Sequence, residues 1–83
     1  MSTSEYVRLS LNDRAQILWD QGTYLETVVY YGQTVKLYSL HSFFVEVFYS
    51  PVTQSIEKIE VAYKDDLKKY LGRIGFECIL NAN

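Results

Sequence analysis

Few residues in this chain have side chains suited to catalysis, since it has one histidine, His41, and one cysteine, Cys78. The strand pairing that we predict below places His41 opposite Tyr24 and diagonal to Glu26. A carboxylate that orients an imidazole is an arrangement used in general acid–base catalysis. A turn histidine without a nucleophile beside it is more often a surface residue. We therefore expect His41 to be dispensable for function.

Metal and cofactor chemistry has no candidate set of residues. One His and one Cys cannot form a His/Cys metal cluster. Cys78 follows Glu77, whose negative charge disfavours the thiolate form of the cysteine. We therefore expect Cys78 to pack as a small hydrophobic residue rather than to act as a nucleophile. Asp65 and Asp66 could bind a cation, but helix capping accounts for both. Because no G-x-S-x-G, P-loop or dinucleotide-binding motif occurs, we expect no catalytic residues, no metal, no cofactor and no enzymatic activity.

A nucleic-acid site has one weak signal, the segment Gly72-Arg73-Ile74-Gly75, which matches the G-x-x-G of KH loops. Lys68 and Lys69 lie nearby, and binding would require them to gather with Arg73 and either Arg8 or Arg14. A KH loop joins two helices, whereas a segment with β propensity follows here. The net charge of −2 and the pI of about 5.2 also argue against nucleic acid as the partner.

Composition predicts one small folded domain over residues 1–83. The chain is 48% hydrophobic and 16% aromatic, which is enough apolar surface to offset the entropy lost on folding. The longest apolar run, Val28–Tyr31, is far shorter than the roughly 18 residues of a membrane-spanning helix. Met1–Glu5 lacks the basic and apolar stretches of a signal peptide. With a single cysteine and therefore no disulfide, we expect a reduced cytoplasmic location.

Two amphipathic segments enclose a β-rich centre. Ser10 and Gly22 are typical N-terminal and C-terminal signals, and they predict a helix over residues 11–21. A second helix is expected to begin near Asp65 and Asp66 and to end at Gly75, with its apolar face formed by Leu67, Tyr70, Leu71 and Ile74. For residues 76–80 we expect either a fifth short strand or a tail that lies over the core.

Four strands are predicted between the helices, beginning at Thr23. Tyr31-Gly32-Gln33-Thr34 has glycine at the first central position of a type II′ turn, which pairs Tyr30 with Val35. Further strands follow at 43–50 and 56–62, with Pro51 in the connecting loop. The expected fold is a two-layer α+β domain: an N-terminal helix, a four-stranded antiparallel meander, a C-terminal helix and the optional fifth strand.

Loop lengths decide which side chains share a face of this sheet. Loops of odd length, 40–42 and 51–55, place a consistent apolar set on one face. This predicted core consists of Val28, Tyr30, Val35, Leu37, Phe43, Val45, Val47, Tyr49, Ile59 and Val61. We expect Leu18, Trp19, Leu67 and Leu71 of the two helices to pack on it.

The opposite face mixes aromatic residues with charges of both signs. It carries Leu25, Thr27, Val29, Tyr31 and Glu60 together with the predicted partner-binding residues Lys36, Tyr38, Phe44, Glu46, Phe48 and Lys58. In the odd-loop register, Phe48 lies opposite Lys58, and Glu46 lies opposite Glu60. Two facing carboxylates need a cation, supplied by Lys36 or by a partner. Either a helix covers this face, or it is an interface, which we favour because of its composition.

Four stretches of the chain carry a resemblance: Gly22–Leu25, Lys36–Tyr38, Phe43–Pro51 and Ile56–Ile59. They resemble short uncharacterised bacterial proteins that share a Phe-Phe-Val-Glu-Val strand and a proline turn. The likeness covers residues 11–74. It implies the meander, and it implies no activity and no site residues.

The function that we expect is that of a small cytoplasmic protein-interaction module, a regulator or an inhibitor of the immunity-protein kind. We expect its partner to be a protein, either a second copy of this chain alone or another protein as well. The two-fold homodimer would form through the second sheet face. One alternative is a small-ligand binder or minor enzyme with a tyrosine-lined pocket bounded by Tyr24, Glu26 and His41. The other alternative is a nucleic-acid-associated protein that uses the C-terminal helix.

Overall fold

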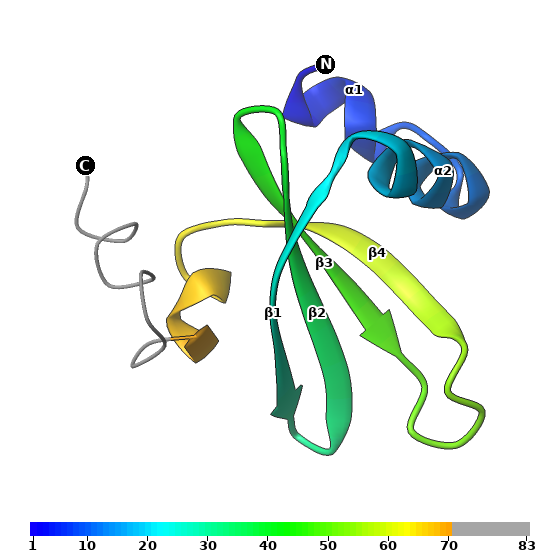
Figure 1. The fold of residues 1–83 in the computed structure, drawn as a ribbon, viewed down its shortest axis with the longest axis vertical. Helices are drawn as coiled ribbons and strands as arrows, with labels where there is room; N and C mark the ends of the chain where they lie inside the picture. Colours follow the sequence, from blue (N-terminus) through cyan, green and yellow to red (C-terminus); the bar gives the residue numbers. More distant parts are fainter. Residues whose placement is uncertain (71–83) are drawn as a thin grey trace.

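The computed structural model describes residues 1–70, and it confirms an α+β chain with a four-stranded antiparallel meander in the order β1-β2-β3-β4 (Figure 1). The elements, in chain order, are α1 Thr3–Val7, α2 Leu11–Gln21, β1 Thr23–Tyr30, β2 Gln33–Leu40, β3 Phe43–Tyr49, β4 Ile56–Ala62 and the 3-10 helix η1 Asp66–Tyr70. The predictions for Leu71, residues 72–75, residues 76–80 and Cys78 lie outside the described residues.

The predicted helix 11–21 is confirmed as α2, with both of its ends as expected. The Ser10 hydroxyl accepts a hydrogen bond from the Asp13 backbone N–H at 3.2 Å. Gly22 closes the helix, and a Cβ atom there would lie 2.6 Å from the Leu18 carbonyl oxygen, so only glycine fits. The short helix α1 was not predicted, although Ser2 and Glu5 form the reciprocal capping box typical of a helix start.

The β1–β2 hairpin turns one residue earlier than predicted. Its central residues are Tyr31 and Gly32, with φ of 52° and 79°, the two positive values of a type I′ turn. Tyr30 therefore pairs with Gln33 rather than with Val35. The observed register differs from the predicted one by two residues, so that Val28 pairs with Val35 rather than with Leu37. Because side chains alternate between the faces with a period of two, a shift of two leaves each residue on its predicted face.

The β2–β3 turn differs from its prediction in a way that changes the faces. Leu40 pairs directly with Phe43, so the turn has two central residues, His41 and Ser42, rather than an odd three. Two-residue turns match the right-handed twist of a hairpin, and His41 takes the positive φ of 54° at the first central position. This shift by one residue exchanges the faces of β3 and β4 relative to β1 and β2.

Each face of the sheet consequently has its own core. Face A is covered by α1 and α2, and it carries Leu40, Phe43, Val45, Val47, Ile59 and Val61 packed against Tyr6 and Leu18. Face B is covered by η1, and it carries Val28, Val35, Leu37 and Ala62 packed against Leu67 and Tyr70, with Phe44 and Phe48 at its margin. The prediction that Leu18 and Leu67 pack on the same face is wrong.

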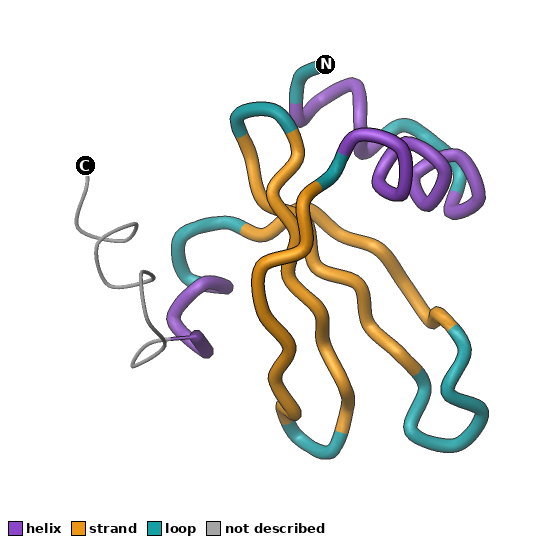
Figure 2. The backbone as a smooth tube through the Cα atoms, in the orientation of Figure 1, coloured by secondary structure: helices purple, strands orange, loops and turns teal. Residues whose placement is uncertain are grey.

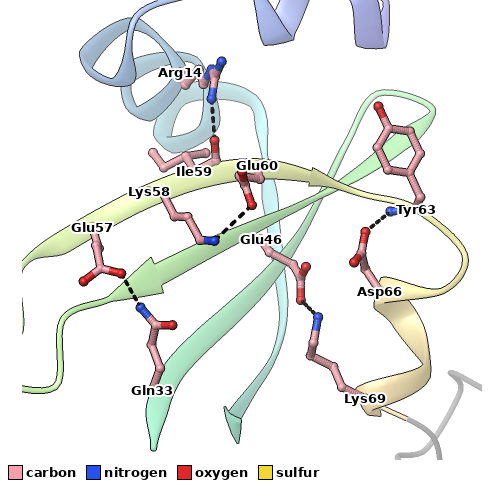
Figure 3. A network of polar contacts seen from close by, with 10 residues as sticks. All are labelled: Arg14, Gln33, Glu46, Glu57, Lys58, Ile59, Glu60, Tyr63, Asp66 and Lys69. Atoms are coloured by element: carbon pink, nitrogen blue, oxygen red, sulfur yellow. Dashed lines mark hydrogen bonds and ion pairs between the residues drawn. The ribbon is translucent and has the colours of Figure 1, made fainter. Parts of the chain in front are cut away.

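The segment after β4 begins where predicted but forms only the short helix η1 within the described residues. The Asp66 carboxylate accepts the Tyr63 backbone N–H at 2.8 Å, which is the expected capping role (Figure 3). Helices α1 and α2 lie together at one margin of the sheet, and η1 lies at another. The β1–β2 and β3–β4 turns both lie at the end of the sheet away from α2 (Figure 2). No helix within residues 1–70 is long and apolar enough to cross a membrane.

Candidate functional site

The predicted partner-binding residues do not form one patch, because they are divided between the two faces. Lys36 and Tyr38 share face A with Val47 and Val45, their partners on β3. The other predicted residues, Phe44, Glu46, Phe48 and Lys58, lie on face B. The expected pairs of Phe48 with Lys58 and of Glu46 with Glu60 are confirmed. The error that divides these residues therefore lies in the β2–β3 turn. The register of β3 against β4 is as predicted from Phe44 to Phe48 and shifts between Phe48 and Tyr49.

Glu46 is an internal residue rather than a surface one, with 2% of its area exposed. One of its oxygens, Oε2, accepts hydrogen bonds from Lys69 Nζ at 2.6 Å and from the Tyr70 hydroxyl at 2.8 Å (Figure 3). The expected cation is therefore present, but it comes from η1 rather than from Lys36 or a partner. Burial, and then the bond to Glu46, raise the pKa of Tyr70, so its hydroxyl stays a donor.

The remaining face-B residues of the predicted patch also have partners in their own chain. Phe44 and Phe48 are partly buried against the face-B core. Lys58 Nζ lies 4.5 Å from the centre of the Phe48 ring and 3.4 Å from the Glu60 carboxylate. The prediction that Phe44 and Phe48 form an exposed aromatic patch is therefore wrong, because both rings are partly buried against the face-B core.

Face A is open where α2 ends. Helix α1 lies beside the β2–β3 turn and α2 lies at the same end of the molecule, so the half of the face toward the β1–β2 and β3–β4 turns has no helix above it (Figure 1). We call the side chains at the margin of α2 and beyond it the open strip: Trp19, Tyr24, Val29, Lys36, Tyr38 and Tyr49. Trp19 is 50% exposed, Tyr24 52% and Val29 72%, which are high values for large apolar residues.

The aromatic residues of the open strip contact one another. The Tyr38 ring lies between Trp19 and Tyr24, with ring centres 5.5 Å and 5.7 Å away. The hydroxyls of Tyr24 and Thr27 share a hydrogen bond of 2.7 Å, which fixes the outer ring. Partial burial, and then the neighbouring Tyr49 and Tyr24, raise the pKa of Tyr38, so its hydroxyl is neutral at physiological pH. The result is an ordered aromatic surface.

A backbone irregularity turns Tyr24 toward this surface. The β1–β2 register shifts between Tyr24 and Glu26, which makes Leu25 the extra residue of a β-bulge. Tyr24 consequently pairs with Tyr38 on face A, whereas Glu26 pairs with Leu37 on face B. Sequence reasoning could not place Tyr24 correctly, because a bulge reverses the alternation of every residue before it.

A groove lies at the other end of the open strip, between the two hairpin ends. Its volume is about 580 Å³, and its lining residues are Val29, Gly32, Thr34, Lys36, Tyr49, Ser50, Pro51 and Gln54. Lys36 Nζ lies 5.3 Å from the centre of the Tyr49 ring. Lys36 is half-buried, and no carboxylate of the described residues forms an ion pair with it.

Arg14 holds α1 and α2 in the position that leaves the strip open. Its guanidinium donates to the carbonyl oxygens of Ile59 and Val7, each at 2.6 Å (Figure 3). The Tyr6 hydroxyl donates to the Arg14 carbonyl oxygen at 2.8 Å. Because the Ile59 carbonyl lies on an edge strand, this contact also closes part of the β4 edge against pairing with another chain.

The residues of the alternative hypotheses are not gathered into a site. Tyr24 and Glu26 project from opposite faces, so the predicted arrangement around His41 is wrong. Among the described residues, Lys69 bonds to Glu46 and Lys68 lies 3.2 Å from Asp65, while Arg73 is outside them. Residues 1–70 hold no group of three or more His, Cys, Asp or Glu that could bind a metal ion.

Sequence reasoning missed two members of the open strip, Trp19 and Tyr49, because it assigned both to the core. The helical period does place Trp19 beside Leu18, but it cannot show that Trp19 lies half exposed against Tyr38 at the margin of the core. Comparisons with protein-family models, curated proteins and solved structures found no match to the chain. The resemblance to short bacterial proteins stays a prediction, and the functional argument rests on the geometry.

Proposed function

We propose that the protein is a small interaction module that binds a protein partner through the open strip. The observation that carries this proposal is the contacting group of Trp19, Tyr38 and Tyr24 beside Lys36, at the margin of α2, where Trp19 and Tyr24 are about half exposed. Trp and Tyr are enriched among the residues that dominate binding energy at interfaces. A small cytoplasmic regulator or inhibitor would suit this size and composition.

The exposure of these residues distinguishes a binding surface from an ordinary core margin. Leu18 is 1% exposed, whereas its neighbour Trp19 is 50% exposed. The apolar side of an amphipathic helix normally turns such a residue inward. An ordered, half-exposed aromatic group can bury a large area on binding and lose little conformational entropy.

A partner of a different sequence fits the open strip better than a second copy. A two-fold contact centred on Lys36 would bring two copies of this lysine together, and no acidic residue belongs to the strip. The homodimer predicted through the second sheet face relied on Glu46, whose charge is satisfied by Lys69. Self-association remains a prediction that sedimentation velocity at tens of micromolar tests.

Site-specific photo-cross-linking in the native host tests the proposal. A photoreactive phenylalanine analogue replaces Tyr24 in one variant and Tyr63 in another. Tyr63 is 61% exposed against 52% for Tyr24, so the two probes are equally accessible. We expect a discrete cross-linked protein from position 24, its loss when Trp19→Ser is added, and no cross-link to that protein from position 63.

Two outcomes contradict the proposal. Cross-links of equal yield from positions 24 and 63 would show non-specific encounters. A cross-link from position 24 that persists in the Trp19→Ser variant, at equal yield, would show that the aromatic group contributes nothing to binding.

A further inference from the structure

The groove at Lys36 has the features of a site for one negatively charged group. We propose that it receives a side-chain carboxylate from an extended acidic segment of the partner. This inference rests on the proposed function and adds the chemistry of the partner to it. Its basis is the placement of Lys36 within the open strip, together with the polar groups around it.

Lys36 differs from the other lysines that the structure describes. Lys58, Lys68 and Lys69 each have a carboxylate at 3.4 Å or closer. Lys64 is exposed in a turn, whereas Lys36 is half-buried on β2, where it pairs with Thr27 of β1 and Val47 of β3. A cation that is partly removed from water and lacks an acidic neighbour in the described part of the chain gains from an incoming carboxylate.

The groove lining suits an anion that accepts hydrogen bonds. Its lining residues include three with a hydroxyl, Thr34, Tyr49 and Ser50, and one with an amide, Gln54, and none is Asp or Glu. The Ser50 Oγ already accepts the N–H groups of Val52 at 3.2 Å and Thr53 at 3.3 Å, which leaves its own hydrogen to donate. One lysine with neutral donors matches the single charge of a carboxylate.

The spacing along β2 determines what the segment must look like. Lys36 and Tyr38 are two residues apart on the same face, so they are separated by about 7 Å along the strand. An extended segment lying along β2 has the same repeat. It would place an aromatic or large apolar side chain on the Tyr38 group and an acidic side chain two positions away in the groove.

Because the chain has a net negative charge, Lys36 attracts a carboxylate only at short range. With a net charge of −2, the protein does not attract an acidic partner from a distance. The carboxylate therefore contributes to affinity only once the aromatic contact has formed, and the dependence on salt is small. This separates an acidic peptide from a polyanion such as nucleic acid, whose binding falls steeply with salt.

Selection from a library of short displayed random peptides tests the inference. We expect peptides selected on the wild type to carry Asp or Glu two positions from an aromatic or large apolar residue. A selected peptide should bind Lys36→Met about tenfold more weakly, as expected for loss of a charge-assisted hydrogen bond. Lys36→Arg should restore most of the affinity, and Lys58→Met, on the opposite face, should change nothing.

The failure of the inference can be told apart from the failure of the proposed function. Selected peptides without acidic residues, which bind wild type and Lys36→Met equally but lose affinity for Trp19→Ser, would overturn the carboxylate site and leave the binding surface standing. Peptides that bind Trp19→Ser as tightly as the wild type would overturn both.

Discussion

The two faces of this sheet are closed by different means. Face A is covered by a capped helix, α2, and by Tyr6 of α1, through an almost wholly apolar cluster. Face B is covered by the short helix η1, which adds a buried carboxylate, Glu46, bonded to Lys69 and Tyr70. The comparison teaches that η1 is held by a buried ion pair, whereas the polar contact that holds α2, from Arg14 to the Ile59 carbonyl, adds no buried carboxylate to its apolar cluster.

The same difference explains why the open strip lies on face A. Helix α2 is fixed at one end of the sheet by the contacts of Arg14 with Ile59 and Val7, and Gly22 ends it before β1. Of the aromatic group, only Trp19 belongs to α2, and the part of face A toward the β1–β2 and β3–β4 turns lies beyond the helix (Figure 1). A surface that the chain does not cover itself is available to a partner.

Removal of the polar anchor should have the largest effect. Glu46→Ala leaves Lys69 with a buried, unpaired charge, and we expect a loss of about 3–5 kcal/mol in the free energy of unfolding, measured with urea. Glu60→Ala is the matched control, since Glu60 pairs with Glu46 across the sheet but is exposed. It should change stability by less than about 1 kcal/mol.

A second variant separates the ion pair from packing. Replacing Glu46 and Lys69 together by Met removes both charges, and this double variant should recover much of the stability lost in Glu46→Ala. Equal losses in the double and single variants would show that face B depends on shape rather than on charge.

The next effect compares neighbours in α2. Leu18→Ala should cost about 2–5 kcal/mol because it opens a cavity in the face-A core. Trp19→Ala should cost about 1 kcal/mol or less, since half of the indole is already exposed. At about 4–8 °C per kcal/mol, thermal unfolding separates the two variants clearly. Equal Tm losses would place Trp19 in the core and remove the open strip.

Alkaline pH should weaken the packing of Tyr6 on face A. Burial raises the pKa of Tyr6 to about 12, against about 10 in the unfolded chain. The folded state therefore keeps a proton that the unfolded state loses, so the contribution of Tyr6 to stability is constant below about pH 9 and falls from about pH 10 upward. Urea unfolding at a series of pH values should give a shallower decline for Tyr6→Phe than for the wild type. Parallel curves would mean that Tyr6 does not titrate with unfolding.

The smallest effect concerns the hairpin end beside the groove. Tyr31 is 92% exposed at a positive φ of 52°, a conformation that asparagine adopts more readily than tyrosine. Tyr31→Asn should stabilise the chain by about 0.5 kcal/mol, and Tyr31→Val, with a branched Cβ, should destabilise it. Thermal unfolding of the two variants checks the signs, and a more stable Val variant would contradict the type I′ turn.

Local signals predicted the elements well. Ser10 and Gly22 correctly located α2, and the pairing of Phe48 with Lys58 followed from the composition of β3 and β4. These predictions depend on interactions between residues close in sequence or on a single connecting loop. The α+β class and the meander follow from them.

The candidate site could not be predicted, because it depends on one residue in the β2–β3 turn and on the one extra residue of a bulge in β1. The two-residue turn at His41 exchanged the faces of half the sheet, and the bulge at Leu25 moved Tyr24 to face A. Free energies that select a turn or a bulge are small, and they are decided by packing over the whole sheet. The half-exposed position of Trp19 also required knowledge of where α2 lies on the sheet.

The most direct test of the binding surface is a heteronuclear NMR titration of the isotope-labelled protein with an acidic peptide selected as above. The indole N–H of Trp19 and the backbone amides of Lys36 and Tyr38 report on the open strip, while those of Phe48 and Lys58 report on face B. We expect saturable shifts at the first group and none at the second. Shifts at Phe48 and Lys58 with an unchanged Trp19 would contradict the assignment of binding to face A.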